Sequence, residues 1–302
     1  MKRGSRAALC VLLIAALSAC AQQAQTDDTA GQTLTEVVVT QPQAADAQQA
    51  AAGQGDGQAE QPEEALADLL SSFTKGRIQA DGQWAAAVQC VGAASCQSAG
   101  SGPMQSASLI KLFVAAAVEE NRQTLTAGER YSGETAELLL RMLSESDNDA
   151  TNELVTRLGA GDASAGMDLV NQYCAANGYP DTSMGRLMLD FTSTADNYTS
   201  VTDCCAFLQA VLENQVPGAE EILSALKQQV RTGKIPAGVP SGVQTANKTG
   251  ELDTVENDAA IIWAGEKPYI LCVMSGGLSD PTEARAQITA LSAQVYALLT
   301  AE

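Results

Sequence analysis

Histidine is absent from the 302 residues of this chain. The Ser-His-Asp and Cys-His arrangements are therefore excluded, because both rely on an imidazole to take the proton of the nucleophile. An alcohol is a poor nucleophile until a neighbouring base removes its proton. A serine nucleophile in this chain would need a lysine or a carboxylate as its base. The sequence also has no Cys-x-x-Cys pair, so we expect no metal site. We also expect no other cofactor.

The N-terminal apolar run is too short to span a bilayer. It covers residues 7–17 and follows three basic residues within the first six, which is the pattern of a secretory signal. The run ends in Leu17-Ser18-Ala19-Cys20, which resembles the lipobox that is cleaved before a cysteine in bacterial lipoproteins. Cys20 is then the expected lipid-bearing N-terminus; an ordinary signal peptide with an unrelated cysteine is the alternative. We expect an exported, membrane-anchored lipoprotein at the bacterial cell envelope.

Large apolar side chains are nearly missing from the segment that follows. Residues 20–63 are rich in Gln, Ala, Thr, Gly and Asp and cannot bury enough surface to offset the entropy of ordering. With residues 1–19 as the signal peptide, residues 20–63 are the expected disordered tether. Residues 64–302 remain for the folded part, enough for one large domain or two closely packed lobes.

Positive charge is scarce. The formal net charge is −19, and three of the 17 basic residues lie in the expected signal peptide, so the mature chain is more negative still. This balance argues against nucleic acid or an anionic lipid surface as a partner. We expect membrane contact only through the lipid anchor, a small-molecule substrate and a monomeric protein.

Six cysteines lie outside the expected signal peptide and anchor. Export permits disulfides, and Cys90 and Cys96 flank a short turn, so a bridge across a tight hairpin is expected there. The pairing of the others cannot be deduced from spacing. Cys174 and Cys272 are expected to be buried thiols.

Helical and extended segments fall into three blocks. Helices are predicted at residues 62–73, 106–119, 134–143, 149–158, 162–177, 201–212, 219–230 and 282–299, and strands at 84–91, near 97, and at 245–250, 259–264 and 269–274. One helix and two strands come first, an all-helical stretch follows, and three strands and a helix close the chain. This order predicts an α/β fold, in which one antiparallel five-stranded sheet is built from both ends of the chain, is flanked by helices and carries an inserted helical lobe.

Ser108 and Lys111 are the first candidates for chemistry. Three residues apart on a predicted helix, they share one face of it. Backbone N–H groups at the start of that helix would face a developing oxyanion beside Ser108. The apolar residues around Lys111 would lower the pKa of its ammonium group, as a lysine base requires. A solvated helix lysine is the alternative for Lys111 taken alone.

A second motif, Ser146-Asp147-Asn148, lies between two predicted helices. Ser146 can relay a proton between Lys111 and a leaving-group nitrogen, and Asn148 can bind a substrate amide. Taken alone, the motif is also compatible with a simple helix cap.

A third motif, Lys248-Thr249-Gly250, lies on a predicted strand. Lys248 and Thr249 can bind a substrate carboxylate, and Gly250 would let a ligand approach the backbone closely. Alone this motif could be a turn, but the three motifs together favour an active site.

The three motifs are similar to the signature of class A β-lactamases and the related penicillin-binding proteins. The resemblance covers roughly residues 64–302 and includes residues 142–152 and Val255-Glu256-Asn257-Asp258. It implies an α/β sandwich plus a helical lobe, with the active site between them and no cofactor. It also implies Ser108 as the acylated nucleophile, Lys111 as its base and Ser146 as the proton shuttle. The backbone N–H groups of Ser108 and Glu251 would form the oxyanion hole.

The chain departs from this family at the step that releases the product. Class A enzymes carry an Arg-x-Glu-x-x-Leu-Asn loop whose glutamate activates the deacylating water. The counterpart at residues 186–191 has Met188 in place of that glutamate, and Asp190 is the nearest carboxylate that a shifted loop could present to the water. The segment between Lys111 and Ser146 is also shorter, which predicts a reduced wall of the cleft. Glu251 would disfavour anionic penicillins unless its side chain points away.

The sequence therefore predicts a serine hydrolase that attacks a β-lactam or related amide carbonyl through an acyl-enzyme on Ser108. A penicillin-binding, D,D-peptidase-like enzyme that acts on peptidoglycan-like cell-wall peptides and deacylates slowly is the second interpretation. A lipoprotein that keeps the fold for binding or sensing without turnover is the third. The presence of Ser108 and Lys111 favours the first two, and the rate of deacylation separates them.

Overall fold

The computed structural model describes residues 60–93, 95–100, 102–265 and 267–301. The expected signal peptide, Cys20 and all but the last four residues of the expected tether lie outside the described residues. Those four residues already belong to the first helix, α1 (Glu60–Ala80). In the described part of the chain, no helix combines the length and the apolar character needed to cross a bilayer.

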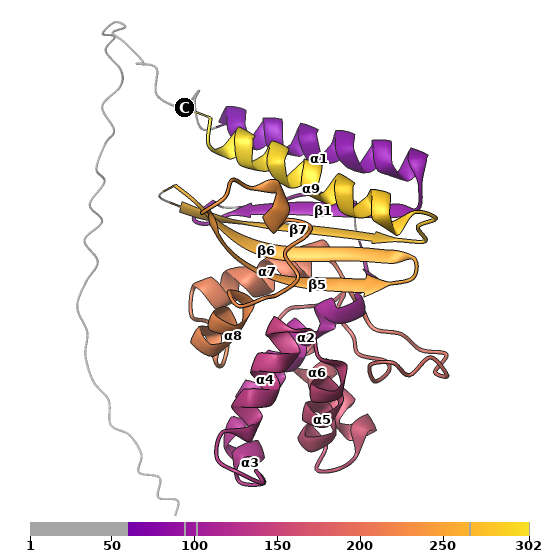
Figure 1. The fold of residues 1–302 in the computed structure, drawn as a ribbon, viewed down its shortest axis with the longest axis vertical. Helices are drawn as coiled ribbons and strands as arrows, with labels where there is room; N and C mark the ends of the chain where they lie inside the picture. The colour runs from indigo at the N-terminus through magenta and orange to yellow at the C-terminus, as the bar shows by residue number, and fades with distance from the viewer. Residues whose placement is uncertain (1–59, 94, 101, 266, 302) are drawn as a thin grey trace, which may run out of the picture. The chain divides into compact units, whose positions relative to one another are not determined.

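An antiparallel five-stranded sheet forms the centre of the fold, in the order β2-β1-β7-β6-β5 (Figure 1). Its strands are β1 (Gln83–Cys90), β2 (Gln97–Ala99), β5 (Gln244–Leu252), β6 (Val255–Ala264) and β7 (Lys267–Gly276). β1 pairs along its whole length with β7, with Ala86 opposite Val273. The sheet is thus built from both ends of the chain, which confirms the predicted fold class, and β5 lies at one edge of it.

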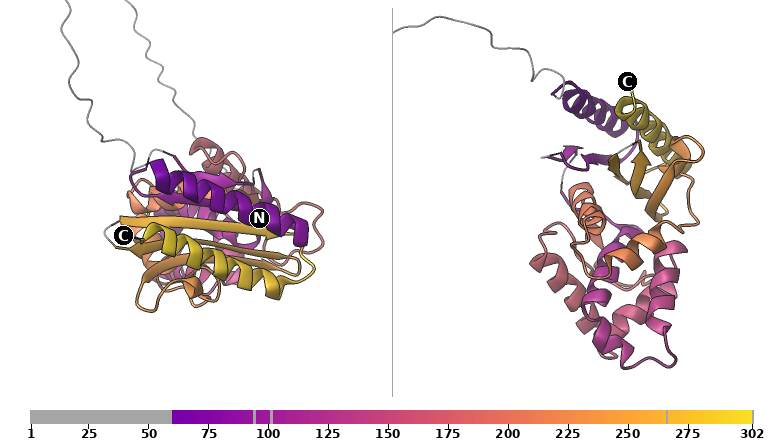
Figure 2. Two further views of the ribbon diagram at one scale, coloured as in Figure 1. Left: turned by 90° about the horizontal axis from the view of Figure 1, so that it is seen from above. Right: turned by 90° about the vertical axis from the view of Figure 1, so that its left-hand side faces the viewer.

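Side chains that alternate along β1 divide the core into two layers. Trp84, Ala86 and Val88 pack in one layer with residues of α1 and of α9 (Pro281–Leu299). Ala87 faces the opposite layer, together with residues of the helical lobe. This period of two follows from the pleat of a strand. Figures 1 and 2 show α1 and α9 side by side on one face of the sheet and the lobe on the other.

The helical lobe is arranged around one buried helix. The lobe's helices include α2 (Ile110–Glu120), α3 (Arg122–Thr126), α4 (Glu134–Ser144), α5 (Asn148–Leu158), α6 (Ala163–Ala176), α7 (Val201–Leu212) and α8 (Ala219–Leu226). Nine of the eleven residues of α2 are buried, because apolar residues occupy every side of it. Asp147 begins α5 by accepting a hydrogen bond from Ala150 N, which satisfies a free backbone donor of the first turn.

Some elements differ from the sequence-based expectation. α8 ends at Leu226, four residues early, because the following chain turns toward α4. There Gln229 Nε2 donates to Leu143 O at 2.7 Å, and Val230 N donates to Ser144 O at 3.0 Å. Helix α3 and the short pair of β3 (Met104–Gln105) with β4 (Tyr198–Thr199) were not predicted, since such short segments carry no periodic pattern.

The predicted bridge between Cys90 and Cys96 is wrong. All six cysteines of the described residues are free thiols. Cys90 packs against the layer of α1 and α9, whereas Cys96 packs against the layer of the lobe, so the two thiols lie on opposite faces of the sheet. The Cys96 thiol donates to Gln97 O at 3.8 Å. Cys174 and Cys272 are fully buried, as predicted.

Candidate active site

Ser108 lies in a tight turn between the lobe and the sheet. It is the middle residue of a short 3-10 helix, η1 (Ala107–Leu109), which leads directly into α2. Asn257 of β6 holds this turn by donating from Nδ2 to Ser106 O at 3.2 Å. Ala107 has a φ of +47°, which is strained for a residue with a side chain. The turn therefore holds the half-buried Ser108 in a fixed position.

Gly250 allows β5 to approach this turn. A Cβ atom at Gly250 would lie 2.6 Å from Ser106 O and 3.2 Å from Ser108 N. The space that was expected to admit a ligand is thus filled by the turn itself, which corrects the role predicted for Gly250. The same approach brings Gly250 beside the amide of Ser108, which the resemblance implies as one half of the oxyanion hole.

The side chain of Lys111 is fully buried. Its Nζ donates to Ser146 O at 2.6 Å and to Asn148 Oδ1 at 2.8 Å, and lies 3.2 Å from Ser146 Oγ. Burial lowers the pKa of Lys111 to about 7, with Asp147 opposing the shift and Arg231 adding to it. A neutral amine has two N–H groups and one lone pair. With both N–H groups on carbonyl oxygens, the lone pair can accept a proton.

Ser146 stands between two lysines. Its Oγ lies 3.2 Å from Lys111 Nζ and accepts a hydrogen bond from Lys248 Nζ at 2.9 Å. Ser146 has a φ of +61°, an uncommon conformation outside glycine. Burial lowers the pKa of Lys248 well below its ordinary value, and the neighbouring Lys111 lowers it further. The hydroxyl of Ser146 can therefore pass a proton between the two amines.

Two adjoining cavities meet at Ser108, and Asn148 and Glu251 also line both of them. The first, of about 160 Å³, is mostly polar and is lined in addition by Ser146, Arg231 and Thr249. The second, of about 60 Å³, is more apolar and is lined in addition by Ala107, Arg186, Met188, Leu189, Phe191, Asn197 and Leu252. In the residues that the structure describes, no group of three or more Cys, Asp or Glu side chains is placed to hold a metal ion.

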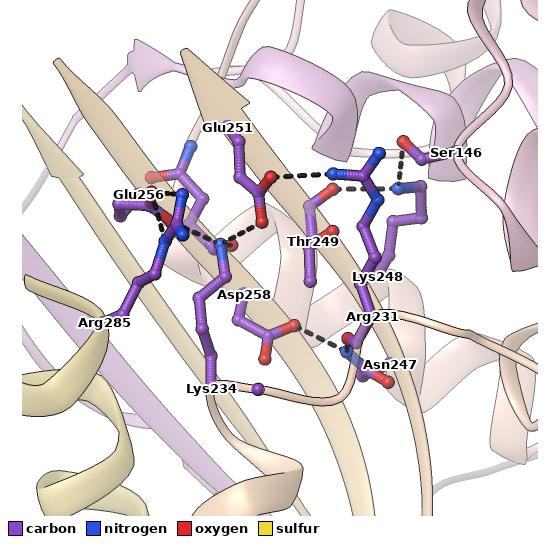
Figure 3. Close-up of polar contacts among 12 residues, drawn as sticks. Ser146, Arg231, Lys234, Asn247, Lys248, Thr249, Glu251, Glu256, Asp258 and Arg285 are labelled. Atoms are coloured by element: carbon purple, nitrogen blue, oxygen red, sulfur yellow. Dashed lines mark hydrogen bonds and ion pairs between the residues drawn. The ribbon is translucent and has the colours of Figure 1, made fainter. Parts of the chain in front are cut away.

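Glu251 points into the cleft, but its charge is balanced by two cations. Arg231 Nη1 donates to Glu251 Oε2 at 2.8 Å, and Lys234 Nζ lies 3.2 Å from Glu251 Oε1 (Figure 3). Burial raises the pKa of Glu251, but Lys234 and Arg231 outweigh that effect, so the pKa is lowered. The carboxylate therefore stays ionised.

The loop at residues 186–191 brings Met188, and not an acid, to the second cavity. Asn152 holds the backbone of Met188: Asn152 Oδ1 accepts from Met188 N at 2.8 Å, and Asn152 Nδ2 donates to Met188 O at 3.0 Å. Asp190 is turned elsewhere, because its Oδ1 accepts from Thr192 N at 3.1 Å and from Thr192 Oγ1 at 2.6 Å. Asp190 lines neither cavity, so the structure does not bring it to Ser108 as the sequence analysis suggested.

The sequence analysis missed a buried group of charges behind the cleft. Lys234, Glu256 and Asp258 are almost completely buried. Lys234 Nζ donates to Glu256 Oε2 at 2.7 Å, and Asp258 accepts from Asn247 Nδ2 at 3.0 Å. Burial raises the pKa of Asp258 to about 6. The one available signal was three consecutive polar residues (256–258) in a strand that is otherwise apolar. Arg231 had no signal, since it lies in a loop outside every motif.

Comparison of the sequence with models of known protein families identifies one family. A model of the β-lactamase enzyme family matches residues 120–299, which is more than half of the chain. The match includes Ser146 and Lys248 and begins after Ser108 and Lys111. Comparison with curated proteins gave no significant match.

Comparison with solved structures gives the fold. A β-lactamase from Xanthomonas campestris is 20% identical, with a TM-score of 0.66, over 79% of this chain and 98% of that chain. A β-lactamase from Sphaerobacter thermophilus is 22% identical, with a TM-score of 0.64, over 79% of this chain and 98% of that chain. The class A β-lactamase of the last common ancestor of Gram-negative bacteria is 21% identical, with a TM-score of 0.65, over 78% of this chain and 99% of that chain.

Proposed function

The chain belongs to the β-lactamase enzyme family, and from this premise we propose that a β-lactam or a related amide acylates Ser108 and that the acyl-enzyme is cleared slowly. The protein is a β-lactamase-like serine hydrolase. One observation carries the proposal. Two buried lysines with depressed pKa values share the hydroxyl of Ser146 beside Ser108, while Met188, at the position where the resemblance implies a glutamate, lines the adjoining cavity.

Acylation begins with the transfer of the Ser108 Oγ proton to the neutral amine of Lys111. Oγ then forms a bond to the carbonyl carbon of the substrate, and the C–N bond breaks as the proton passes from Lys111 through Ser146 to the leaving nitrogen. The described residues show no hydrogen bond between Ser108 Oγ and Lys111 Nζ. Such contacts often tighten only when substrate binds. Thr249 and Arg231 line the polar cavity and would hold the substrate carboxylate there, and Asn148 would bind the acyl amide. Lys248 does not line this cavity and acts through Ser146 instead.

Deacylation lacks a base of the usual kind. Met188 presents a thioether, which cannot take a proton from water. Among the carboxylates of the described residues, Glu251 is the one that lines both cavities, and Arg231 and Lys234 hold its two oxygens. A water in the second cavity therefore has no free carboxylate to activate it, so we expect the ester on Ser108 to persist.

The same observation supports a second candidate, a D,D-peptidase-like enzyme that acts on cell-wall peptides. Such an enzyme can transfer the acyl group to the amine of a second peptide instead of to water, and an amine needs less help than water because it is the stronger nucleophile. Met188 is therefore compatible with turnover on peptides even where the β-lactam ester persists.

For location, we propose an exported lipoprotein anchored through Cys20, and the support is the lipobox-like sequence with its apolar run. Cells that express the wild-type chain and the Cys20→Ser variant would be extracted with detergent, and the mass of the N-terminal peptide of each protein would be measured by mass spectrometry. A diacylglyceryl mass on Cys20, absent from the variant, supports the anchor; an unmodified Cys20 in the mature wild-type chain overturns it.

The acyl-enzyme is tested with a fluorescent penicillin and a chromogenic cephalosporin on the purified chain. Stable label with little colour change is the expected result, and the Ser108→Ala variant should take no label. Rapid colour change with transient label would show a working hydrolytic route and would overturn slow deacylation. Label that survives in the Ser108→Ala variant would overturn the assignment of the nucleophile.

A further inference from the structure

Glu251 belongs to a series of alternating charges that runs from Arg285 at the surface to Arg231 in the cleft. On α9, Arg285 Nε donates to Glu256 Oε1 at 2.7 Å, and the other carboxylate oxygen of Glu256 accepts from Lys234 at 2.7 Å. Lys234 is 3.2 Å from Glu251, which in turn accepts from Arg231 at 2.8 Å (Figure 3). In this series of charges Lys234 and Glu256 are buried, whereas Arg231 is half-exposed.

The carboxylate of Glu251 occupies a position where a substrate would interact. It borders both cavities, and these meet at Ser108. Arg231 is the exposed cation of the polar cavity, and one of its terminal nitrogens already binds Glu251. A substrate carboxylate that reaches Arg231 would share the guanidinium with Glu251. Two carboxylates on one guanidinium repel each other, and like charges placed side by side strongly disfavour a complex.

We propose that Glu251 determines substrate specificity by favouring β-lactams and related amides in which a cationic group accompanies the carboxylate. This inference rests on the proposed acylation of Ser108. The substrate carboxylate on Arg231 would continue the alternation of charge, and a substrate ammonium beside Glu251 would offset the repulsion between the two carboxylates. Because Glu251 lines the cavities on both sides of Ser108, the ammonium can lie on the acyl part of the substrate.

Ampicillin and benzylpenicillin are a suitable pair of probes, because their acyl side chains differ by one amino group. The second-order rate constant for acylation of the full chain would be measured for each, at a pH where that amine is protonated, by competition with a fluorescent penicillin. For the wild-type chain we expect ampicillin to react at least about 10-fold faster.

The Glu251→Gln variant removes the charge and keeps an oxygen that can accept from Arg231. We expect its rate constant for benzylpenicillin to rise by about 10-fold, so that the ratio of the two rate constants approaches one. The Glu220→Gln variant is the matched control. It changes net charge equally at an exposed residue of α8 that lines neither cavity at Ser108, and its ratio should equal that of the wild type.

The outcomes separate this inference from the proposed function. If both penicillins acylate the wild-type chain at equal rates, or if Glu251→Gln slows both without changing their ratio, Glu251 only positions Arg231 and the inference is wrong. If neither penicillin acylates Ser108 in the wild type or the variant, the proposed function fails and this inference fails with it.

Discussion

Met188→Glu should convert slow deacylation into fast deacylation. The Met188 side chain is 7% exposed and lines the same cavity as Ser108 and Asn148. Glutamate is similar in length, and the two hydrogen bonds from Asn152 involve only the backbone of residue 188. The loop should therefore keep its course and present the new carboxylate to a water beside the acyl group.

The size of the effect follows from two opposing terms. A positioned general base typically contributes about 10²–10⁴-fold, which corresponds to roughly 3–5 kcal/mol of activation free energy. Burial in this cavity would raise the pKa of the new carboxylate and reduce its ionised fraction, while Arg186, which lines the same cavity, would favour the ionised form. We therefore expect the deacylation rate constant to rise by about 10²-fold, the lower end of this range. We also expect a loss of roughly 1–3 kcal/mol in the free energy of unfolding.

The measurement is the decay of label after a chase. Protein loaded with a fluorescent penicillin is mixed with an excess of unlabelled penicillin, and the loss of fluorescence from the protein band gives the deacylation rate constant. Met188→Gln is the matched control, because it has the same shape as glutamate but cannot act as a base. Equal decay in the Glu and Gln variants, or no acceleration in either, would show that the missing carboxylate is not what limits deacylation.

Three further predictions concern acylation and stability. Because Lys111 acts as a neutral amine with a pKa of about 7, the acylation rate constant should rise with pH and be half-maximal near pH 7; a flat profile from about pH 5 to 9 would exclude Lys111 as the base. Gly250→Ala would place a Cβ atom 2.6 Å from Ser106 O, so acylation should fall by roughly 10-fold or more with little change in the circular dichroism spectrum. Hydrogen bonds from Arg157 and Arg130 lower the pKa of Glu134 to about 2. Stability from Glu134 is therefore present above its unfolded pKa of about 4.5 and is lost toward pH 2, so Glu134→Gln should lower the Tm at pH 7, and the difference should vanish as the pH approaches 2.

The fold was largely predictable because its elements are long and regular. The final three strands and the helix at 201–212 follow from apolar spacing alone, and the order of the elements led to the correct sheet. The elements that were missed are short, such as α3 and the β3–β4 pair, and depend on contacts between distant segments. The wrong disulfide has the same cause: Cys90 and Cys96 are close in sequence, but the pleat of the sheet places them on opposite faces.

The candidate site was also only partly predictable from the sequence. Ser108, Lys111, Ser146 and Lys248 lie in local motifs, and the structure brings their turns and strands together. Arg231 has no such motif, because its place in the cleft depends on the early end of α8 and on the bond between Val230 and Ser144.

The surroundings of Lys111 and Lys248 argue against a purely structural role for either side chain. A buried ammonium group is strongly destabilising unless a carboxylate pairs with it. In the described residues neither lysine forms an ion pair: Lys111 donates to neutral oxygens of Ser146 and Asn148, and Lys248 to Ser146 and to its own neighbour's carbonyl. Asp147, the acid that opposes the lowering of the Lys111 pKa, is bound to Arg141 instead. The site thus keeps two amines that give up their protons easily around one hydroxyl. Such an arrangement weakens the fold but suits proton transfer, which favours an acylating enzyme over a module that only binds.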